Sequence, residues 1–314
     1  RLAVCYRREV TPFGTAFTIR KFREDPYSII DLINLGTLSE EMAAYFWMCL
    51  ENRASVMVLG GTAAGKTTAL NALACLIKPG SKLVTIEETA ELNLPHENWV
   101  SLIARKSYGL GENQSGEVTL FDLVKTSMRH RPDVLIVGEI RGNEAYVLFQ
   151  ALATGHGGMC TMHAEGIDSA VKRLTSKPMD IAPTYIPLMN IVATVRRVHL
   201  PEAGEMKAYR RVVSVDEITD YEDYRNIFTW KPAKDIYGSS LKNGKVLSII
   251  SEQRGYSEKE LFEEIERRKN LLSWMRERNI RSYKDVAAII TEYYSKPKES
   301  FEGEVEIVAV PQHS

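Results

Sequence analysis

The chain has 314 residues, of which 44% are apolar and 26% are charged, and its formal net charge is −1. A chain of this length can bury a substantial core in one large or two ordinary domains, and its balance of apolar and charged residues excludes disorder over most of it. The near-neutral charge argues against a general nucleic-acid-binding protein, because such proteins usually carry a strongly basic surface.

The N-terminal part of the chain predicts two strands followed by helices. Residues 2–22 are expected to form two short strands, with Pro12 and Gly14 in the turn between them. Asp25–Pro26 is expected to cap and open a helix through SIIDLINL. Ser39, followed by two glutamates that suit the positive end of a helix, is expected to begin a second one.

Apolar runs alternate with helical segments through the middle of the chain. These runs are SVMVL, KLVTIEE, DVLIVGEI and GMCTMH. Continuous apolar strands separated by helices indicate a parallel sheet that is covered on both faces. The later runs IVATVRRV and YRRVVSVDEI are predicted to be edge strands. The expected fold class is therefore α/β with a mostly parallel sheet.

The last part of the chain is predicted to be helical. Ser257 and Glu260 form an S-x-x-E capping box, and apolar residues then recur at helical spacing. Ser282 is expected to begin a further helix.

Cysteine spacing and hydropathy narrow the class of protein further. Four cysteines lie far apart in apolar surroundings: Cys5, Cys49, Cys75 and Cys160. Because they lack C-x-x-C spacing, we interpret them as small buried hydrophobic residues in a reducing compartment. No run approaches the roughly 20 apolar residues of a transmembrane helix. The chain begins at Arg1 without a methionine, and we expect it to be a piece of a longer protein.

Residues 60–68 read GGTAAGKTT and match the pattern G-x-x-x-x-G-K-[ST] between a predicted strand and a predicted helix. Small residues allow the backbone to curl so that its amides and the helix N-terminus face phosphate oxygens. Lys66 is expected to bridge the β- and γ-phosphates, and Thr67 to hold magnesium. The predicted cofactors are ATP and Mg²⁺. The predicted nucleotide-binding residues are Gly60, Gly61, Thr62, Ala63, Ala64, Gly65, Lys66, Thr67 and Thr68.

Acidic residues end two of the other apolar runs. DVLIVGEIRG carries Glu139 at the carboxyl end of a strand, where a Walker B acid belongs, and we expect it to act on magnesium or on the attacking water. LVTIEETAEL ends its strand with Glu87 and Glu88. One of this pair is expected to polarise the water, with Glu87 as our choice, while the other is solvated or paired with a cation.

Two histidines flank the last central run, in ATGHGGMCTMHAEG. His163 is predicted to stand at the carboxyl end of its strand, the edge where open α/β sheets bind ligands, and to sense the γ-phosphate by a hydrogen bond. A zinc site made of His156, Cys160 and His163 is the alternative, but it lacks a fourth ligand.

Four stretches in this order resemble the Walker A, Asp box, Walker B and His box of the type II and type IV secretion ATPase superfamily: GGTAAGKTT, TIEETAEL, RHRPDVLIVGEIRG and TGHGGMCTMHA. GTAFTIRKF and LPHENW are similar to its archaeal branch, which drives secretion or the assembly of a pilus or archaellum. The resemblance covers about residues 10–220. It implies a RecA-like P-loop NTPase domain preceded by part of a smaller N-terminal domain.

The resemblance also implies a division of the chain and a set of partners. Residues 1–24 would end an N-terminal domain and its linker, residues 25–230 would form the ATPase domain, and residues 231–314 a helical C-terminal region. The family implies a homohexamer on the cytoplasmic face of an integral membrane platform protein, with ATP held between domains and against a neighbouring subunit. We therefore expect a cytoplasmic protein, peripherally associated with the inner face of the membrane, without stable nucleic-acid binding.

Arg20 and Arg23 fall where the family supplies cations from the N-terminal domain, and an arginine finger is expected there. A purely structural role for both arginines is an equal alternative. The sequence departs from the family pattern at Glu88, where Asp is common. It also has Gly142 where Asp is common, which removes a side chain that could cap the Walker B loop.

The predicted function is an ATP-hydrolysing hexameric motor that powers protein secretion, or pilus or archaellum assembly, through a membrane platform protein. Two alternatives stay open. A DNA-translocating ATPase of the conjugation type predicts turnover that DNA stimulates and that depends strongly on salt. A non-hydrolysing scaffold that binds ATP in order to assemble predicts oligomerisation without phosphate release.

Overall fold

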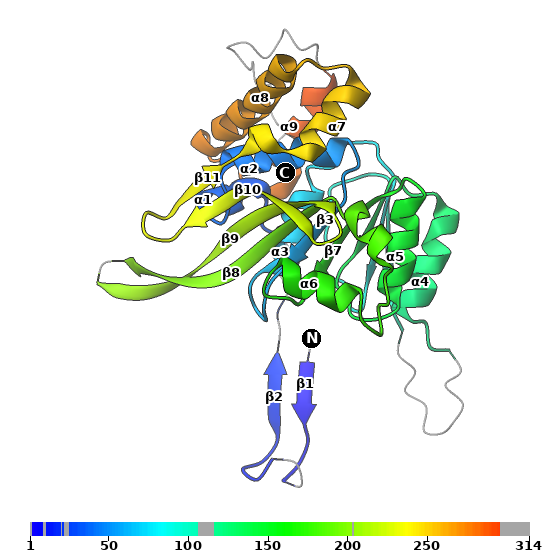
Figure 1. The fold of residues 1–314 in the computed structure, drawn as a ribbon. Coiled ribbons are helices and arrows are strands. Elements are labelled where there is room, and N and C mark those ends of the chain that lie inside the picture. The colour runs from blue at the N-terminus through cyan, green and yellow to red at the C-terminus, as the bar shows by residue number, and fades with distance from the viewer. Residues whose placement is uncertain are drawn as a thin grey trace, which may run out of the picture.

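The computed structural model of the chain describes residues 2–8, 11–19, 21, 25–105, 116–202 and 204–295. Within these ranges the centre of the molecule is a nine-stranded sheet (Figure 1). In chain order its strands are β3 (Val56–Leu59), β4 (Leu83–Glu87), β5 (Trp99–Ile103), β6 (Val134–Val137), β7 (Gly157–Met162), β8 (Ile191–Glu202), β9 (Glu205–Asp220), β10 (Asp223–Lys231) and β11 (Ile236–Ser239). Their order in space is β11-β10-β9-β8-β3-β7-β6-β4-β5.

The sheet is parallel from β8 through β5, and β9, β10 and β11 extend it with antiparallel pairs. Every residue of β3, β4, β6 and β7 is buried, because helices cover both faces at the centre of the sheet. The predicted α/β fold with a mostly parallel sheet is confirmed.

The two strands that we predicted to be edges lie inside the sheet. β8 pairs with both β3 and β9, and β9 pairs with both β8 and β10. Residues 191–195 of β8 are buried beside β3, whereas the rest of the strand runs past the end of β3 and is mostly exposed. The edge prediction is wrong because one continuous strand passes from a buried environment into a solvated one.

Helices divide the core into two clusters, one on each face of the sheet. One face carries α1 (Ile29–Asn34), α2 (Glu40–Glu51), α3 (Lys66–Ala74), α7 (Lys245–Arg254), α8 (Glu258–Glu277) and α9 (Tyr283–Ser295). The other carries α4 (Leu120–Ser127), α5 (Glu144–Ala153), α6 (Ile167–Leu174) and the 3-10 turn η2 (Pro183–Leu188). Two further 3-10 turns are η1 (Met128–His130) and η3 (Leu241–Asn243). Along β3, Val56 and Val58 face the first cluster and Met57 and Leu59 the second, as the period of a strand requires.

Capping side chains determine where two of the helices begin. Ser257 and Glu260 form the predicted capping box of α8. The first helix begins at Ile29 rather than at Asp25–Pro26, because the hydroxyl of Ser28 accepts a hydrogen bond from an amide of its first turn. The expected cap at Asp25 is therefore wrong.

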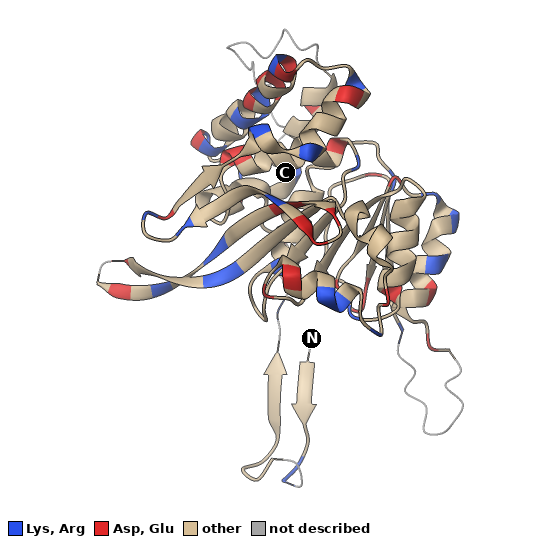
Figure 2. Cartoon of the chain, in the orientation of Figure 1, with Lys and Arg blue, Asp and Glu red and all other residues tan. Residues whose placement is uncertain are grey.

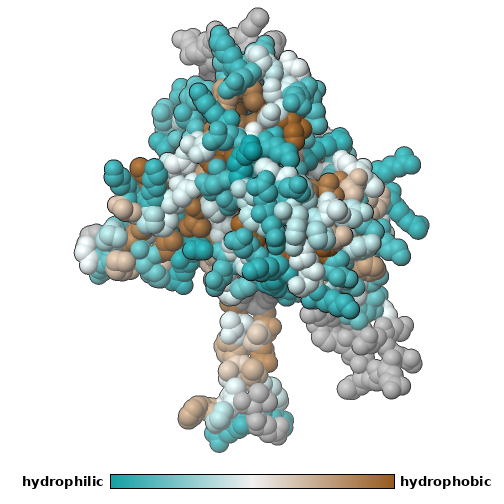
Figure 3. Space-filling model, viewed as in Figure 1, coloured by the Kyte–Doolittle hydropathy of each residue, from teal (hydrophilic) through white to brown (hydrophobic). Residues whose placement is uncertain are grey.

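The N-terminal strands β1 (Leu2–Cys5) and β2 (Ala16–Ile19) form a separate antiparallel hairpin that projects from the body of the molecule (Figure 1). The cross-strand pairs Leu2–Ile19 and Val4–Phe17 place four apolar side chains on one face, and all four are exposed. Figure 3 shows this largely apolar column standing clear of a more hydrophilic body. The predicted pair of strands is confirmed.

Three of the four cysteines are buried, as predicted: Cys49, Cys75 and Cys160. Burial raises the pKa of the Cys75 thiol to about 12. Cys5 is exposed, so the prediction is wrong for this residue, which lies on the projecting hairpin rather than in a core. Within the described ranges no helix is both long enough and apolar enough to cross a bilayer.

The C-terminal helices α7, α8 and α9 form a unit that packs on α1 and α2 (Figure 1). Arg276 at the end of α8 pairs with Glu40 of α2 over 2.7 Å, and Arg281 before α9 pairs with Asp31 of α1 over 2.7 Å. The sheet itself continues to Ser239, past residue 230 where we placed the end of the ATPase domain. The domain boundaries stay a prediction.

Candidate active site

Four parallel strands bring the predicted site residues to one end of the sheet, which we call the carboxyl edge: the carboxyl ends of β3, β4, β6 and β7. The loop 60–68 follows β3, and Glu139 and His163 follow β6 and β7. Glu87 is the last residue of β4. Because β3, β7, β6 and β4 are consecutive in the sheet, residues far apart in the sequence converge on this edge.

The loop between β3 and α3 has the curled backbone that a phosphate-binding loop requires. Ala63 has a φ of 58° and Gly65 a φ of 96°, a left-handed conformation that bulky side chains disfavour. A Cβ atom on Gly60 would stand 2.5 Å from the carbonyl oxygen of Val195 in β8, so this position excludes larger residues. α3 begins at Lys66, and the first amides of a helix have no partner within it. These amides are available to phosphate oxygens.

Lys66 is half-buried at the start of α3, and its ammonium group donates a hydrogen bond to the Gly61 carbonyl over 3.0 Å. An ammonium group has three donors, so this bond leaves others for a ligand. Burial lowers the pKa of Lys66, and the negative charge of Glu139 opposes that lowering. The loop cation and the predicted Walker B acid therefore lie close enough to affect each other.

Arg141 joins the acids that follow β6 and β4. Its Nη2 atom forms an ion pair with Glu139, and its Nη1 atom lies 3.9 Å from Glu88 Oε2. The side chain of Glu139 is 29% exposed and that of Glu88 is 37% exposed. The hydrogen bond to Glu139 raises the pKa of Arg141. Two carboxylates held by one guanidinium thus reach solvent at the carboxyl edge, beside the phosphate loop.

Glu87 is bound by the loop that follows it. The residue is 4% exposed, and its carboxylate accepts hydrogen bonds from the amides of Glu91 over 3.0 Å and Leu92 over 3.1 Å. A carboxylate bound by two backbone amides stabilises its loop and has less capacity to orient a water molecule. This geometry favours Glu88 over Glu87 as the solvent-facing acid of the pair. The catalytic role of Glu87 stays a prediction.

Two polar residues that the sequence analysis did not select hold the backbone of the Walker B loop. Glu144, buried in the first turn of α5, accepts hydrogen bonds from the amides of Arg141 over 2.5 Å and Gly142 over 2.7 Å. Thr161 in β7 donates its hydroxyl to the Gly138 carbonyl over 2.7 Å. Glu144 therefore provides a cap of the kind that position 142 lacks. An acid in a first turn is too common a pattern to have predicted this role.

The two histidines lie at opposite ends of β7. His156 precedes the strand, and its Nδ1 atom lies 3.0 Å from Thr154 Oγ1. His163 follows the strand at the carboxyl edge, is exposed, and accepts a hydrogen bond from Arg173 through its carbonyl. Cys160 is buried between them, so the three alternative zinc ligands do not converge. The position of His163 agrees with its predicted placement, and its role as a γ-phosphate sensor stays a prediction.

The oxygen atoms at the carboxyl edge fit the chemistry of magnesium. Thr67 lies half-buried in the first turn of α3, and Glu139 supplies a partly exposed carboxylate. Magnesium usually takes few protein oxygens and completes its shell with water and phosphate. Among the described residues, no group of three His, Cys, Asp or Glu is placed to bind a metal by itself. Arg20 and Arg23 lie outside the described residues.

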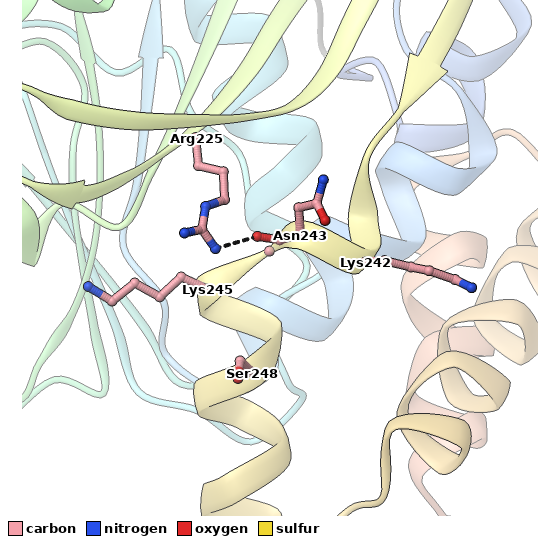
Figure 4. Close-up of a pocket in the computed structure, with 6 residues that line it drawn as sticks. Arg225, Lys242, Asn243, Lys245 and Ser248 are labelled. Atoms are coloured by element: carbon pink, nitrogen blue, oxygen red, sulfur yellow. Dashed lines mark hydrogen bonds between the residues drawn. The ribbon is translucent and has the colours of Figure 1, made fainter.

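A separate hollow of about 580 Å³ lies at the start of α7 (Figure 4). Arg225 donates to the Asn243 carbonyl over 2.6 Å, and Lys245 Nζ donates to the Thr219 carbonyl over 2.7 Å. Figure 4 shows Lys242 and Lys245 extending in opposite directions. The residues that line this hollow come from β10, η3 and the start of α7, and none of them is a predicted site residue, so the hollow does not belong to the candidate active site.

Comparison with known proteins places the chain in a family and in a fold. The family described as "Type II/IV secretion system protein" matches residues 8–217. An uncharacterized protein of Methanocaldococcus jannaschii, MJ0900, is 39% identical over 94% of this chain, and the chain spans 54% of the length of MJ0900. Conjugal transfer protein TrbB of Rhizobium radiobacter is 32% identical to this chain, and the match covers 68% of this chain and 62% of the length of TrbB.

The crystal structure of the pilus retraction motor PilT with bound ADP resembles this structure with a TM-score of 0.50. The two share 19% sequence identity over 67% of this chain and 58% of PilT. Similarity at this level of identity shows the fold alone. The predicted RecA-like P-loop fold is confirmed.

Proposed function

The chain belongs to the type II/IV secretion system protein family, and on that premise we propose that it is an ATP-hydrolysing motor of a secretion or filament-assembly machine. One observation carries the proposal. The half-buried loop lysine Lys66 follows β3 and the acid Glu139 follows β6 at the same carboxyl edge, and Arg141 links that acid to Glu88. A cation for phosphate oxygens and two solvent-facing acids at one strand edge are the parts that phosphoryl transfer to water requires.

Each residue has a proposed role. The amides of loop 60–68 and Lys66 bind the phosphates of ATP. Thr67 and Glu139 would hold Mg²⁺, which neutralises phosphate charge when bound. Glu88 is the better placed acid to orient a water, because Glu87 is bound by its own loop. His163 would sense the γ-phosphate, and an arginine finger from Arg20 or Arg23 stays part of the proposal.

The oligomeric state and the membrane partner are also part of the proposal. We propose a homohexamer on the cytoplasmic face of the membrane, where it acts on an integral membrane platform protein. Two similar proteins, one named for conjugal transfer and the other for pilus retraction, support a link to transport or filament machinery, whereas the hexamer and the platform protein rest on the family resemblance alone. The exposed apolar face of the β1–β2 hairpin is consistent with a further domain or neighbour beside it.

Release of phosphate from ATP tests the proposal directly. Lys66→Ala should lower turnover by about 100-fold or more, because it removes the cation that meets the transferring phosphate. Lys125→Ala is the matched control, since Lys125 is an exposed lysine on α4, and its turnover should stay within about twofold of the wild type. A wild-type chain without activity, or a Lys66→Ala variant with full activity, would overturn the assignment.

A DNA-translocating motor is the rival that the similarity to TrbB favours. It predicts turnover that rises several-fold with double-stranded DNA and loses that stimulation as salt increases. A secretion motor should show the same turnover with and without DNA at low salt. Measuring phosphate release under these conditions separates the two motors, and a chain that oligomerises with ATP but releases no phosphate would be the scaffold.

A further inference from the structure

The β8–β9 hairpin contacts both ends of the phosphate loop. The carbonyl of Val195 in β8 closes the space beside Gly60, the first glycine of the pattern. Arg210 in β9 lies against Gly65, the last one: a Cβ atom on Gly65 would stand 2.9 Å from Arg210 Cδ and 3.3 Å from its Nε. The guanidinium stem therefore packs on the turn where the loop becomes α3.

The guanidinium of Arg210 is charged and exposed, and among the described residues no acceptor for it is found. This distinguishes Arg210 from its neighbours on the hairpin. Arg196 donates to the Glu165 carbonyl over 2.9 Å, and Arg211 forms two hydrogen bonds to Asp235, of 2.8 and 2.7 Å. Figure 2 shows blue bands of Lys and Arg on the ribbons of β8 and β9.

The backbone of Arg210 is fixed by the residue that follows it. Arg211 is 4% exposed, and its Nη1 atom donates both to the Arg210 carbonyl over 2.9 Å and to the Leu35 carbonyl over 2.9 Å. Its bidentate pair with Asp235 anchors the same guanidinium on the turn before β11. Arg210 is therefore held on a rigid strand beside the loop, which is the preorganisation that a binding residue needs.

We propose that Arg210 is a nucleotide-binding residue that the chain supplies to its own site, where its guanidinium contacts the diphosphate portion common to ATP and ADP. This inference rests on the proposed function of the carboxyl edge. Arg210 approaches the loop from the β9 and β8 side of β3, opposite to the β7 and β6 side that carries Glu139. A cation on that side strengthens binding of the bound diphosphate without touching the acids that act on water.

Calorimetry with ADP and with ATP, each with Mg²⁺, tests this role. Arg210→Ala should raise the dissociation constants of ATP and ADP by about tenfold or more and by similar factors, because a charge-assisted contact that both nucleotides make is lost. The KM for ATP should rise by a similar factor, because the lost contact is already made in the bound ground state. Arg210→Lys should recover part of the affinity, since it restores the charge without the planar fork.

The control is Lys207→Ala, which removes a cation from the same strand near the hairpin tip, where Lys207 pairs with Glu202 over 3.0 Å. It should bind both nucleotides like the wild type, and the thermal midpoint of Arg210→Ala should equal that of the wild type. If the wild type binds nucleotide and Arg210→Ala binds it equally well, the inference is overturned while the proposed function stands. If Arg210→Ala lowers only turnover, the inference is overturned in favour of a catalytic cation. A wild type that binds neither nucleotide overturns both.

Discussion

Charged residues at the carboxyl edge and at the interface of the C-terminal helices differ in their exposure to solvent and in their hydrogen-bond partners. At the interface, Glu217 is 0% exposed and accepts hydrogen bonds from the Tyr45 hydroxyl over 2.7 Å and the Lys245 amide over 2.6 Å. At the edge, Glu139 and Glu88 keep a substantial part of their surface in solvent. Buried charges need complete sets of partners from the protein itself, whereas a site that binds a ligand leaves capacity for it.

Arg268 shows the same contrast on the cationic side. It is 3% exposed in α8, donates to Glu264 over 3.1 Å and to Glu51 of α2, and its guanidinium lies 5.0 Å above the ring of Trp47. Arg141 at the carboxyl edge has two acids within reach but a side chain that is 59% exposed. One buried donor of Arg268, Nη1, has no hydrogen-bond partner among the described residues. The comparison teaches that burial beside opposite charges marks structural charges in this molecule, and partial exposure marks candidate functional ones.

The largest expected effect comes from Glu139→Gln at the edge. Turnover should fall by about 10³-fold, because the amide cannot take part in proton transfer or balance the charge of magnesium. Nucleotide affinity should change by no more than a few-fold. Phosphate release and calorimetry measure the two effects. Glu165→Gln, an exposed glutamate that follows β7, is the control and should behave like the wild type; a Glu139→Gln variant with normal turnover would contradict the comparison.

Next in size is Arg268→Ala at the helical interface. Removing one partner of a buried ion pair should cost about 3–5 kcal/mol of unfolding free energy, since Glu264 and Glu51 lose the buried cation that they share. Chemical denaturation measures the loss, while turnover of the folded fraction should be unchanged. Arg267→Ala is the control, because Arg267 pairs with Glu264 from a side chain that is 31% exposed, and it should cost about 1 kcal/mol or less. Equal losses would refute the distinction.

The adjacent acids Glu87 and Glu88, at the end of β4, allow a second comparison between a buried acid and an exposed one. Glu88→Gln should lower turnover by about 10²-fold with little change in stability. Glu87→Gln should instead cost about 1–3 kcal/mol of unfolding free energy, because one oxygen that accepts loop amides becomes an NH₂ group. Parallel kinetics and denaturation of both variants decide the matter. The reverse pattern would return the catalytic role to Glu87, as the sequence analysis expected.

The smallest effect concerns the pH dependence of the Arg211–Asp235 pair. The hydrogen bond from Arg211 lowers the pKa of Asp235 in the folded chain. A carboxyl group with a lowered folded pKa stabilises the protein above its unfolded pKa of about 3.9, and this contribution is lost as the pH falls through the folded pKa. Because Asp235 is partly solvated, Asp235→Asn should cost about 1 kcal/mol at pH 7.

Urea denaturation of this variant and the wild type at pH 7 and at progressively lower pH tests the sign. The difference between the two proteins should shrink below about pH 4. A difference that stays constant down to the lowest pH would show that the carboxylate charge contributes nothing. The same variant should weaken nucleotide binding slightly if Arg211 positions Arg210, as inferred above.

The sequence by itself determined the α/β fold class and the positions of the loop 60–68 and of Glu139 after their strands, while the roles of these residues stay predictions. The fold class and these positions follow from local patterns: small residues before a lysine, apolar runs that end in an acid, and capping pairs such as Ser257 with Glu260. Each of these patterns spans only a few residues, so it can be recognised in the sequence without knowledge of the tertiary contacts. The same locality explains why the cap at Asp25 was wrong, since Ser28 competes for the same helix start a few residues later.

Only the tertiary structure decided what the remaining polar residues do. In the folded chain Glu87 is buried and accepts hydrogen bonds from the amides of its own loop, and Glu144 accepts them from amides of the Walker B loop. Arg210 of β9 packs against Gly65. The tertiary structure also places β8 and β9 inside the sheet. The physical reason is that the role of a charge depends on its partners and its exposure, and these come from strands and helices that are distant in sequence.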